Sequence, residues 1–326
     1  MQQLPYIDWD QAAKVGGQLA HPGPELTPGQ IAQVVDALRS AAAKAPAHIT
    51  EVSGMATPAP ADTLVVDRAG WLAAMAASAR AIMTGLGAPQ APEGGLDKVR
   101  GRTLGLQAGG LFAALSSRIL GQFDPFGQPN RLLLVAPNVV AIERRLGVNP
   151  TDFRLWVCLH EQTHQYQFGQ APWLREHLLG LMAELLNDTE PLRQWRAGER
   201  PRSIAEAVIA PAQRESFDQV TAIMSLLEGH ADVMMDRVGT AVLPTLPVIR
   251  RAFEHHRDRG GWSAILSKLL GADLKRAQYR DGAKFCQLVL KRADTDLLNL
   301  AFSQPAMLPS LAEIHDPEQW LHRVGQ

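Results

Sequence analysis

Hydrophobic positions along the chain recur mostly at spacings of three and four residues, the pattern of helices with one buried face. In the first half this pattern predicts a helix that begins at Thr27-Pro28, with Thr as cap and Pro at the first helical position. The stretches 45–62 and 87–95 are rich in Ala, Gly and Pro and predict loops. Further helices are predicted over 68–86 and 103–120.

One segment instead has the pattern of a strand. Residues 131–136 form a short apolar run, bounded on each side by a Pro-Asn pair. A helix is predicted to follow and to end at Gly147, and Asn149-Pro150 is a strong start signal for the next one. The same reasoning predicts further helices over 173–186, 215–238, 248–257, 262–269 and 281–291, with a charged loop at 188–201. The expected fold class is therefore mainly α, with a short strand element near 131–136.

Composition narrows the classes of function. The chain has 326 residues, of which 46% are hydrophobic and 20% charged, so it can form a packed core. A net charge of -1 provides no general basic field, and no nucleic-acid partner is expected. Two cysteines, Cys158 and Cys286, cannot form a disulfide framework, and the first residues lack a signal-peptide pattern. A reducing, cytoplasmic location is expected.

Two uncharged stretches bear on membrane association. Residues 103–117 and 297–312 are both shorter than the roughly 20 apolar residues that a membrane span needs. No stable membrane insertion is expected. The first stretch is predicted to be a buried helix, with a helix at a membrane interface as the alternative.

The strongest chemical signal is His160-Glu161-Gln-Thr-His164. Residues four apart on a helix differ by about 40° in direction, so both imidazoles can reach one metal ion. Glu161 is turned about 100° from His160, which suits a general base beside the metal. Apolar neighbours such as Trp156 and Phe168 indicate a largely buried helix, where polar side chains are costly without a ligand. The sequence therefore predicts a catalytic zinc site.

The third ligand is open between two glutamates. The metzincin pattern is excluded, because it needs Gly at 167 and His at 170 and the chain has glutamine at both positions. A Glu followed four residues later by Asp can supply a ligand and a partner for a ligand imidazole from one helix face. Two such pairs exist, Glu184 with Asp188 and Glu228 with Asp232. The second pair is favoured, because its apolar surroundings predict burial and its small neighbours, Gly229 among them, allow close approach.

With these segments in view, the chain resembles a family of zinc-dependent, metallopeptidase-like hydrolases of the zincin (gluzincin) type. Some members are labelled as associated with biosynthesis of a deazaflavin coenzyme. The resemblance is carried by residues 120–124, 132–138, 155–164, 226–232 and 279–285, with a few shorter matches, and covers about residue 100 to the end. It implies a mostly helical zincin-like fold with His160, His164 and Glu228 on zinc and Glu161 as base. Accordingly, we expect an N-terminal helical region at 1–100 and a metal-binding domain at 101–326, or one compact domain.

The expected activity is hydrolysis of a peptide or small amide by a zinc-bound water that Glu161 activates. Tyr279 is a candidate donor to the oxyanion, with Asp232 behind the zinc ligands, and Arg276 could hold a substrate carboxylate. In zincins, a strand edge beside the metal helix often binds extended substrate, and 131–136 is the candidate for that strand. The alternatives are a zincin fold that binds metal without catalysis and a helical binding protein without metal. Substrate and oligomeric state do not follow from the sequence.

Overall fold

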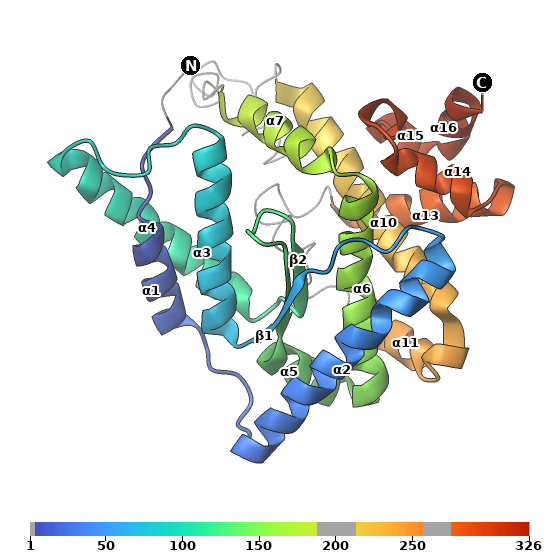
Figure 1. The fold of residues 1–326 in the computed structure, drawn as a ribbon, viewed down its shortest axis with the longest axis horizontal. Coiled ribbons are helices and arrows are strands. Elements are labelled where there is room, and N and C mark those ends of the chain that lie inside the picture. Colours follow the sequence, from blue (N-terminus) through green and yellow to red (C-terminus); the bar gives the residue numbers. More distant parts are fainter. Residues whose placement is uncertain (1–3, 188–212, 257–274, 326) are drawn as a thin grey trace.

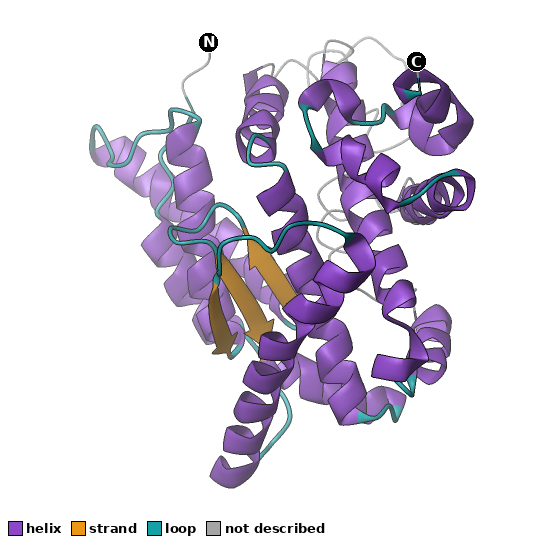
Figure 2. Ribbon diagram, turned by 45° about the vertical axis from the view of Figure 1, so that its right-hand side comes forward, coloured by secondary structure: helices purple, strands orange, loops and turns teal. Residues whose placement is uncertain are grey.

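The computed structural model describes residues 4–187, 213–256 and 275–325. Helices dominate, as the sequence predicts, and a small sheet lies among them (Figures 1 and 2). The first half contains α1 (Trp9–Leu19), α2 (Pro28–Ser53), β1 (Asp62–Val66), α3 (Arg68–Gly85), α4 (Gly95–Ser116), β2 (Gly121–Asp124), β3 (Arg131–Val135) and α5 (Ala136–Leu146). The second half contains α6 (Pro150–Gln170), α7 (Leu174–Asn187), α10 (Arg214–Val242), α11 (Leu246–His256), α13 (Lys275–Arg292), α14 (Thr295–Asn299), η4 (Leu300–Phe302), η5 (Pro305–Met307), α15 (Leu311–His315) and α16 (Pro317–Val324). The predicted fold class is confirmed.

The sheet has three strands in the order β1-β3-β2, where the sequence predicts one. β1 pairs with β3 in parallel, and β2 pairs with β3 antiparallel. The predicted strand at 131–136 is thus the central strand, which explains its unbroken apolar sequence, because helices cover both of its faces. The two outer strands carry polar residues among the apolar ones, so they lack a comparable signal.

Side chains of β3 alternate between two hydrophobic clusters. Leu133 and Val135 pack with Trp71, Leu72 and Leu115 of α3 and α4. Leu132 and Leu134 belong to the larger cluster, which takes in residues of α2, α6, α10 and α13. The sheet therefore separates a small layer of helices from a large one, and the motif helix α6 lies in the large one (Figure 2).

α2 runs through part of the segment predicted to be a loop. The helix begins at a capping box on Thr27, as predicted, but continues past Pro46 to Ser53. Proline has no N–H, so the carbonyl of Ala42 loses its helical donor. Gln162 of α6 replaces that donor, because its Nε2 donates to Ala42 O over 2.9 Å. The loop prediction was wrong for 45–53 because the partner of this backbone comes from a distant segment.

The region before residue 100 shares its core with the rest of the chain. β1 completes the sheet through β3, and α2 packs along α6. The first helix, α1, packs against α3 and α4. A boundary at residue 100 would therefore divide one sheet and one hydrophobic core.

Two helix contacts depend on glycine. A Cβ atom at Gly229 of α10 would lie 2.2 Å from the carbonyl carbon of Gly282 in α13, so the two backbones touch at this crossing. A Cβ atom at Gly105 of α4 would lie 2.3 Å from the carbonyl oxygen of Asp8, just before α1. Among the described helices, none combines the length and apolarity of a membrane span.

We predict that Gln162→Leu lowers the free energy of unfolding by about 1–3 kcal/mol, because it leaves the buried carbonyl of Ala42 without a donor. In a Pro46→Ala background the loss should be smaller, since residue 46 then supplies its own N–H to that carbonyl. Urea unfolding of the four proteins in this double-mutant cycle measures both. Equal losses in the two backgrounds would contradict the assignment.

Candidate metal centre

The polar side chains of α6 contact α2 on one side of the helix and α10 on another. Asn149 caps the helix by accepting hydrogen bonds from the N–H groups of Thr151 and Asp152. On one side, Gln162 and Tyr166 bind the backbone of α2, the latter through a hydrogen bond of 2.9 Å to Pro46 O. On another side, His160 and His164 face α10. The motif helix is thus held from behind while its histidines meet a second helix.

Three potential ligand atoms converge between α6 and α10. The Nε2 atoms of His160 and His164 are 3.4 Å apart. A Glu228 oxygen lies 3.5 Å from the first of them, and the other oxygen lies 3.8 Å from the second. Donors about 2.0–2.1 Å from a tetrahedral zinc ion are separated by about 3.4 Å. The three side chains therefore have the spacing and the donor atoms of a His-His-Glu zinc site.

The electrostatics of this group favour a cation at its centre. Burial alone would lower the pKa of His160, but its hydrogen bond to Glu228 and the charges of Glu161 and Glu228 raise it to about 9. Burial would raise the pKa of Glu228, but the two histidines hold it below its usual range. The pKa of His164 is lowered, first by burial. A carboxylate buried beside two imidazoles thus requires positive charge, which a proton or a metal ion can provide.

Gln167, one turn after His164, determines which ring nitrogen of that imidazole carries the hydrogen. Its side-chain nitrogen donates to Leu227 O over 2.8 Å, and a carbonyl can only accept, so the orientation of the amide is settled. The amide oxygen then faces His164 Nδ1 at 2.9 Å, and that nitrogen must carry the proton. His164 Nε2 is left with its lone pair toward His160 and Glu228. A ligand imidazole in a metal site has this arrangement.

The same amide nitrogen lies 3.1 Å from His230 Nδ1, which must therefore accept. His230 is fully buried, and burial, with the charges of His164 and Arg237, lowers its pKa to about 3. A neutral His230 is consistent with that acceptor role. Gln167 thus connects the motif helix to the backbone and to one side chain of α10.

The two candidates for the third ligand lie in different places. Glu228 lies on α10 beside the histidines. Glu184 is exposed on α7 and accepts a hydrogen bond from Ser216 instead. Its companion Asp188 lies outside the described residues. The geometry therefore favours Glu228.

Comparison with known proteins shows the family of this chain. The model of a family described as zincin-like metallopeptidases matches residues 7–321. The chain belongs to that family. It also resembles a crystal structure from Chloroflexus aurantiacus, described as a proposed hydrolase with a novel fold, with 28% identity and a TM-score of 0.73 over 98% of this chain and 99% of that one. A comparison with curated proteins gives no match.

The zincin-like family match confirms the resemblance read from the sequence and extends it to the N-terminal hundred residues. It implies a metal, typically zinc, and supports a zinc-dependent hydrolase. The donor set described above fits that metal.

His160 also has a buried Nδ1 with no hydrogen-bond partner in the described part of the chain, and its ring stacks beside Trp156 at 6.5 Å between centroids.

The side chain of Glu161 extends from α6 toward the sheet. Only 4% of its surface is exposed, and a Cβ atom at Gly121 of β2 would lie 2.6 Å from its Cγ. Gly121 therefore provides the space that the glutamate occupies.

The expectation that 131–136 forms the strand edge beside the metal helix is wrong, because β3 is paired on both sides. The outer strand next to α6 is β2, which packs directly on that helix.

Asp232, which was expected behind the zinc ligands, acts on His160 through its negative charge, which helps to raise the pKa of that imidazole. Asp232 forms an ion pair with Arg250 of α11, and that arginine also binds Asp236 at 2.7 Å. In the described part of the chain no hydrogen bond joins Asp232 to a motif histidine; Gln167 has that role for His164. Tyr279 and Arg276 belong to the first turns of α13, and their side chains lie outside the described residues.

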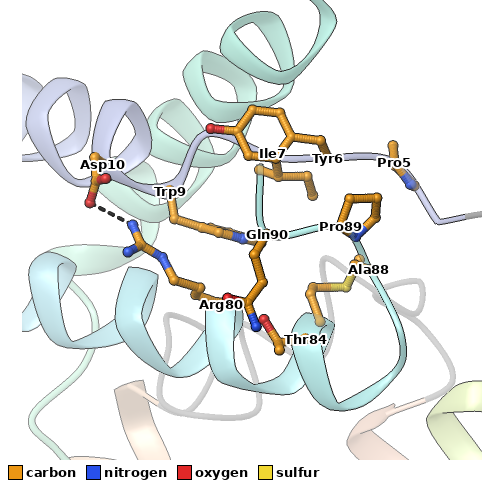
Figure 3. Close-up of a pocket in the computed structure, with 11 residues that line it drawn as sticks. Pro5, Tyr6, Ile7, Trp9, Asp10, Arg80, Thr84, Ala88, Pro89 and Gln90 are labelled. Carbon is orange, nitrogen blue, oxygen red and sulfur yellow. Dashed lines mark hydrogen bonds and ion pairs between the residues drawn. The ribbon is translucent and has the colours of Figure 1, made fainter. Parts of the chain in front are cut away.

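A separate cavity lies between the N-terminal segment and α3, near Tyr6, Trp9 and Gln90 (Figure 3). The ion pair of Asp10 with Arg80, 2.5 Å long, lies at its side. Its volume is about 70 Å³, well below that of common ligand pockets. None of its lining residues belongs to the histidine–glutamate group. The cavity therefore has no part in the candidate metal centre.

We predict that protein purified without a metal column contains about one zinc per chain, and that Glu228→Gln loses most of it because one of the three donors is weakened. Glu184→Gln is the matched control and should keep the metal. Elemental analysis measures all three proteins. Loss of zinc in Glu184→Gln with retention in Glu228→Gln would contradict the ligand assignment.

We also predict that Gln167→Leu lowers zinc affinity about 10–100-fold, because His164 loses the acceptor that orients it. Gln170→Leu changes an exposed glutamine three residues later on α6 and should leave the affinity unchanged. Competition with a zinc chelator measures the affinities. Equal affinities of the two variants would show that Gln167 has no influence on the ligand.

Proposed function

We propose that this protein is a zinc-dependent hydrolase that cleaves amide bonds in peptides or small amides. The observation that supports this most strongly is the spacing of the three donor atoms, which suits tetrahedral zinc, with a glutamate next to the first histidine in the chain. Three protein ligands leave a fourth position open, as in catalytic rather than structural zinc sites. His160, His164 and Glu228 would hold the ion.

Zinc in such a site supplies a water of lowered pKa and polarises a carbonyl group. The chain itself must then move one proton, and Glu161 is the candidate. Its side chain is buried beside Gly121. Its neighbouring position to His160 on α6 supports a role beside the proposed ligands rather than as one of them. Glu161 would accept a proton from the attacking water and pass it to the leaving nitrogen of the amide.

The sheet offers a way to orient an extended substrate. β2 is the outer strand nearer to α6, is antiparallel to β3 and begins at Gly121, beside the side chain of Glu161. A peptide that added to β2 as a further strand would lie with its backbone beside the general base. This assigns to β2 the role that the sequence suggested for 131–136. Tyr279 remains a proposal for the oxyanion donor, since its helix packs against α10.

Glu161→Gln decides between catalysis and metal binding alone. We predict a fall in turnover of about 10²–10⁴-fold, because the amide cannot accept the proton, while the zinc content stays unchanged. Glu176→Gln, an exposed glutamate on α7, is the control and should be fully active. Activity is measured on peptide and amide libraries with zinc-loaded protein.

Two outcomes would contradict the proposal. Full activity of Glu161→Gln would exclude this residue as the base. A zinc-loaded wild-type protein that hydrolyses no member of either library would instead support the non-catalytic alternative.

A further inference from the structure

α4 combines two properties that are rarely found together. From Thr103 to Ser117 it has no charged residue, and a helix that is uncharged all round is normally buried. Its inner face is indeed buried, through Gly101, Gly105 and Gly109, which contact the backbone or side chains of residues 6–16. Its outer face is exposed. The sequence prediction of a buried helix is therefore right for only one side of α4.

The outer face exposes a row of aliphatic side chains to solvent, with the uncharged Thr103 and Gln107 beside them. Leu96 is 77% exposed and Val99 63%, and Leu106 and Leu111 are also exposed. On a helical wheel, Val99, Leu106 and Gly110 point within about 40° of one another, with Leu96 close by. A Cβ atom at Gly110 would meet no other atom within 4 Å, so this face is open. An exposed apolar row of this kind usually marks a surface that contacts something.

Basic residues without partners stand at both ends of the row. Lys98, Arg100 and Arg102 are exposed in the first turns of α4, and Arg118 is exposed just beyond its end. No ion pair involves any of these four side chains among the residues that the structure describes. Asp97 is the one acidic residue within α4. Even with Glu93 just before the helix, positive charges outnumber negative ones at both ends of the row.

We propose that the outer face of α4 binds an anionic lipid surface, with Leu96, Val99 and Leu106 inserted among the acyl chains and the flanking arginines at the headgroups. Helices that lie in the membrane interface have this combination of aliphatic and basic side chains. α4 is also placed for it, since its first turns project from the molecule beyond α1 (Figure 1). The proposal is independent of the zinc site.

A second copy of the chain is a poorer occupant of this face. From Leu96 to Gly110 the row is about 21 Å long and one helix wide, or about 230 Å², whereas a stable interface buries about 800 Å² on each partner. Two α4 helices would also bring like charges together. In a parallel pair the cluster 98–102 meets itself, and in an antiparallel pair it meets Arg118. A lipid surface requires neither the area nor opposite charges on the same helix.

The experiment is flotation of the full-length protein with vesicles. Neutral phosphatidylcholine vesicles are compared with vesicles in which part of this lipid is replaced by phosphatidylserine. We expect at least about tenfold stronger binding to the anionic vesicles, weakened by added salt. Leu106→Asp, and separately Leu96→Asp in the exposed first turn, should lower this binding about tenfold or more. The pair Arg100→Glu with Arg102→Glu should do the same.

Ile31→Asp is the matched control, because Ile31 is 50% exposed on α2, on a different helix from the row. It should bind vesicles as the wild type does, and circular dichroism checks that every variant folds. Absence of binding to anionic vesicles, equal binding to neutral ones, or equal losses in Ile31→Asp and Leu106→Asp would overturn the proposal. A dimer in solution that Leu106→Asp dissociates would assign the face to a second copy instead.

Discussion

The structure depends on hydrogen bonds made by the buried polar side chains of α6. A buried polar group is costly unless it finds a hydrogen-bond partner, and α6 has such groups on two sides. Gln162 and Tyr166 find theirs on the backbone of α2, and Gln167 finds its partners on α10. The helices beside α6 are therefore joined to it by specific hydrogen bonds as well as by apolar contact. The motif histidines lie between these attachments.

The sequence is sufficient to predict the part of the candidate site that lies on one helix. His160, Glu161 and His164 follow from the helical repeat alone, because four residues return a side chain to the same face. The third ligand could be narrowed to two glutamates, Glu184 and Glu228. Glu228 was favoured, because the apolar residues around it predict that its helix is buried. The distances that favour Glu228 depend on the packing of α10 against α6, which the sequence does not give.

Other features depend on contacts between distant segments and left little trace in the sequence. The end of α2 was missed because Pro46 predicts a break, and the donor that compensates for it lies on α6. β1 and β2 were not predicted because polar residues interrupt the apolar sequence of both strands. In the sequence alone, Gln167 is informative only as a departure from the metzincin pattern. The available signal was its place three residues after His164, which puts it on the same face of α6.

The hydrogen bond from Gln167 to Leu227 O has a consequence for the order in which the centre is assembled. Before α10 docks, the amide of Gln167 is free to turn, and His164 can carry its proton on either nitrogen. Docking presents a carbonyl that orients the amide, and the amide then selects the form of the imidazole whose Nε2 has a free lone pair. The same docking event brings Glu228 to the histidines. The position of the candidate third ligand and the tautomer of His164 are thus set together, so the candidate metal centre is complete only in the folded protein.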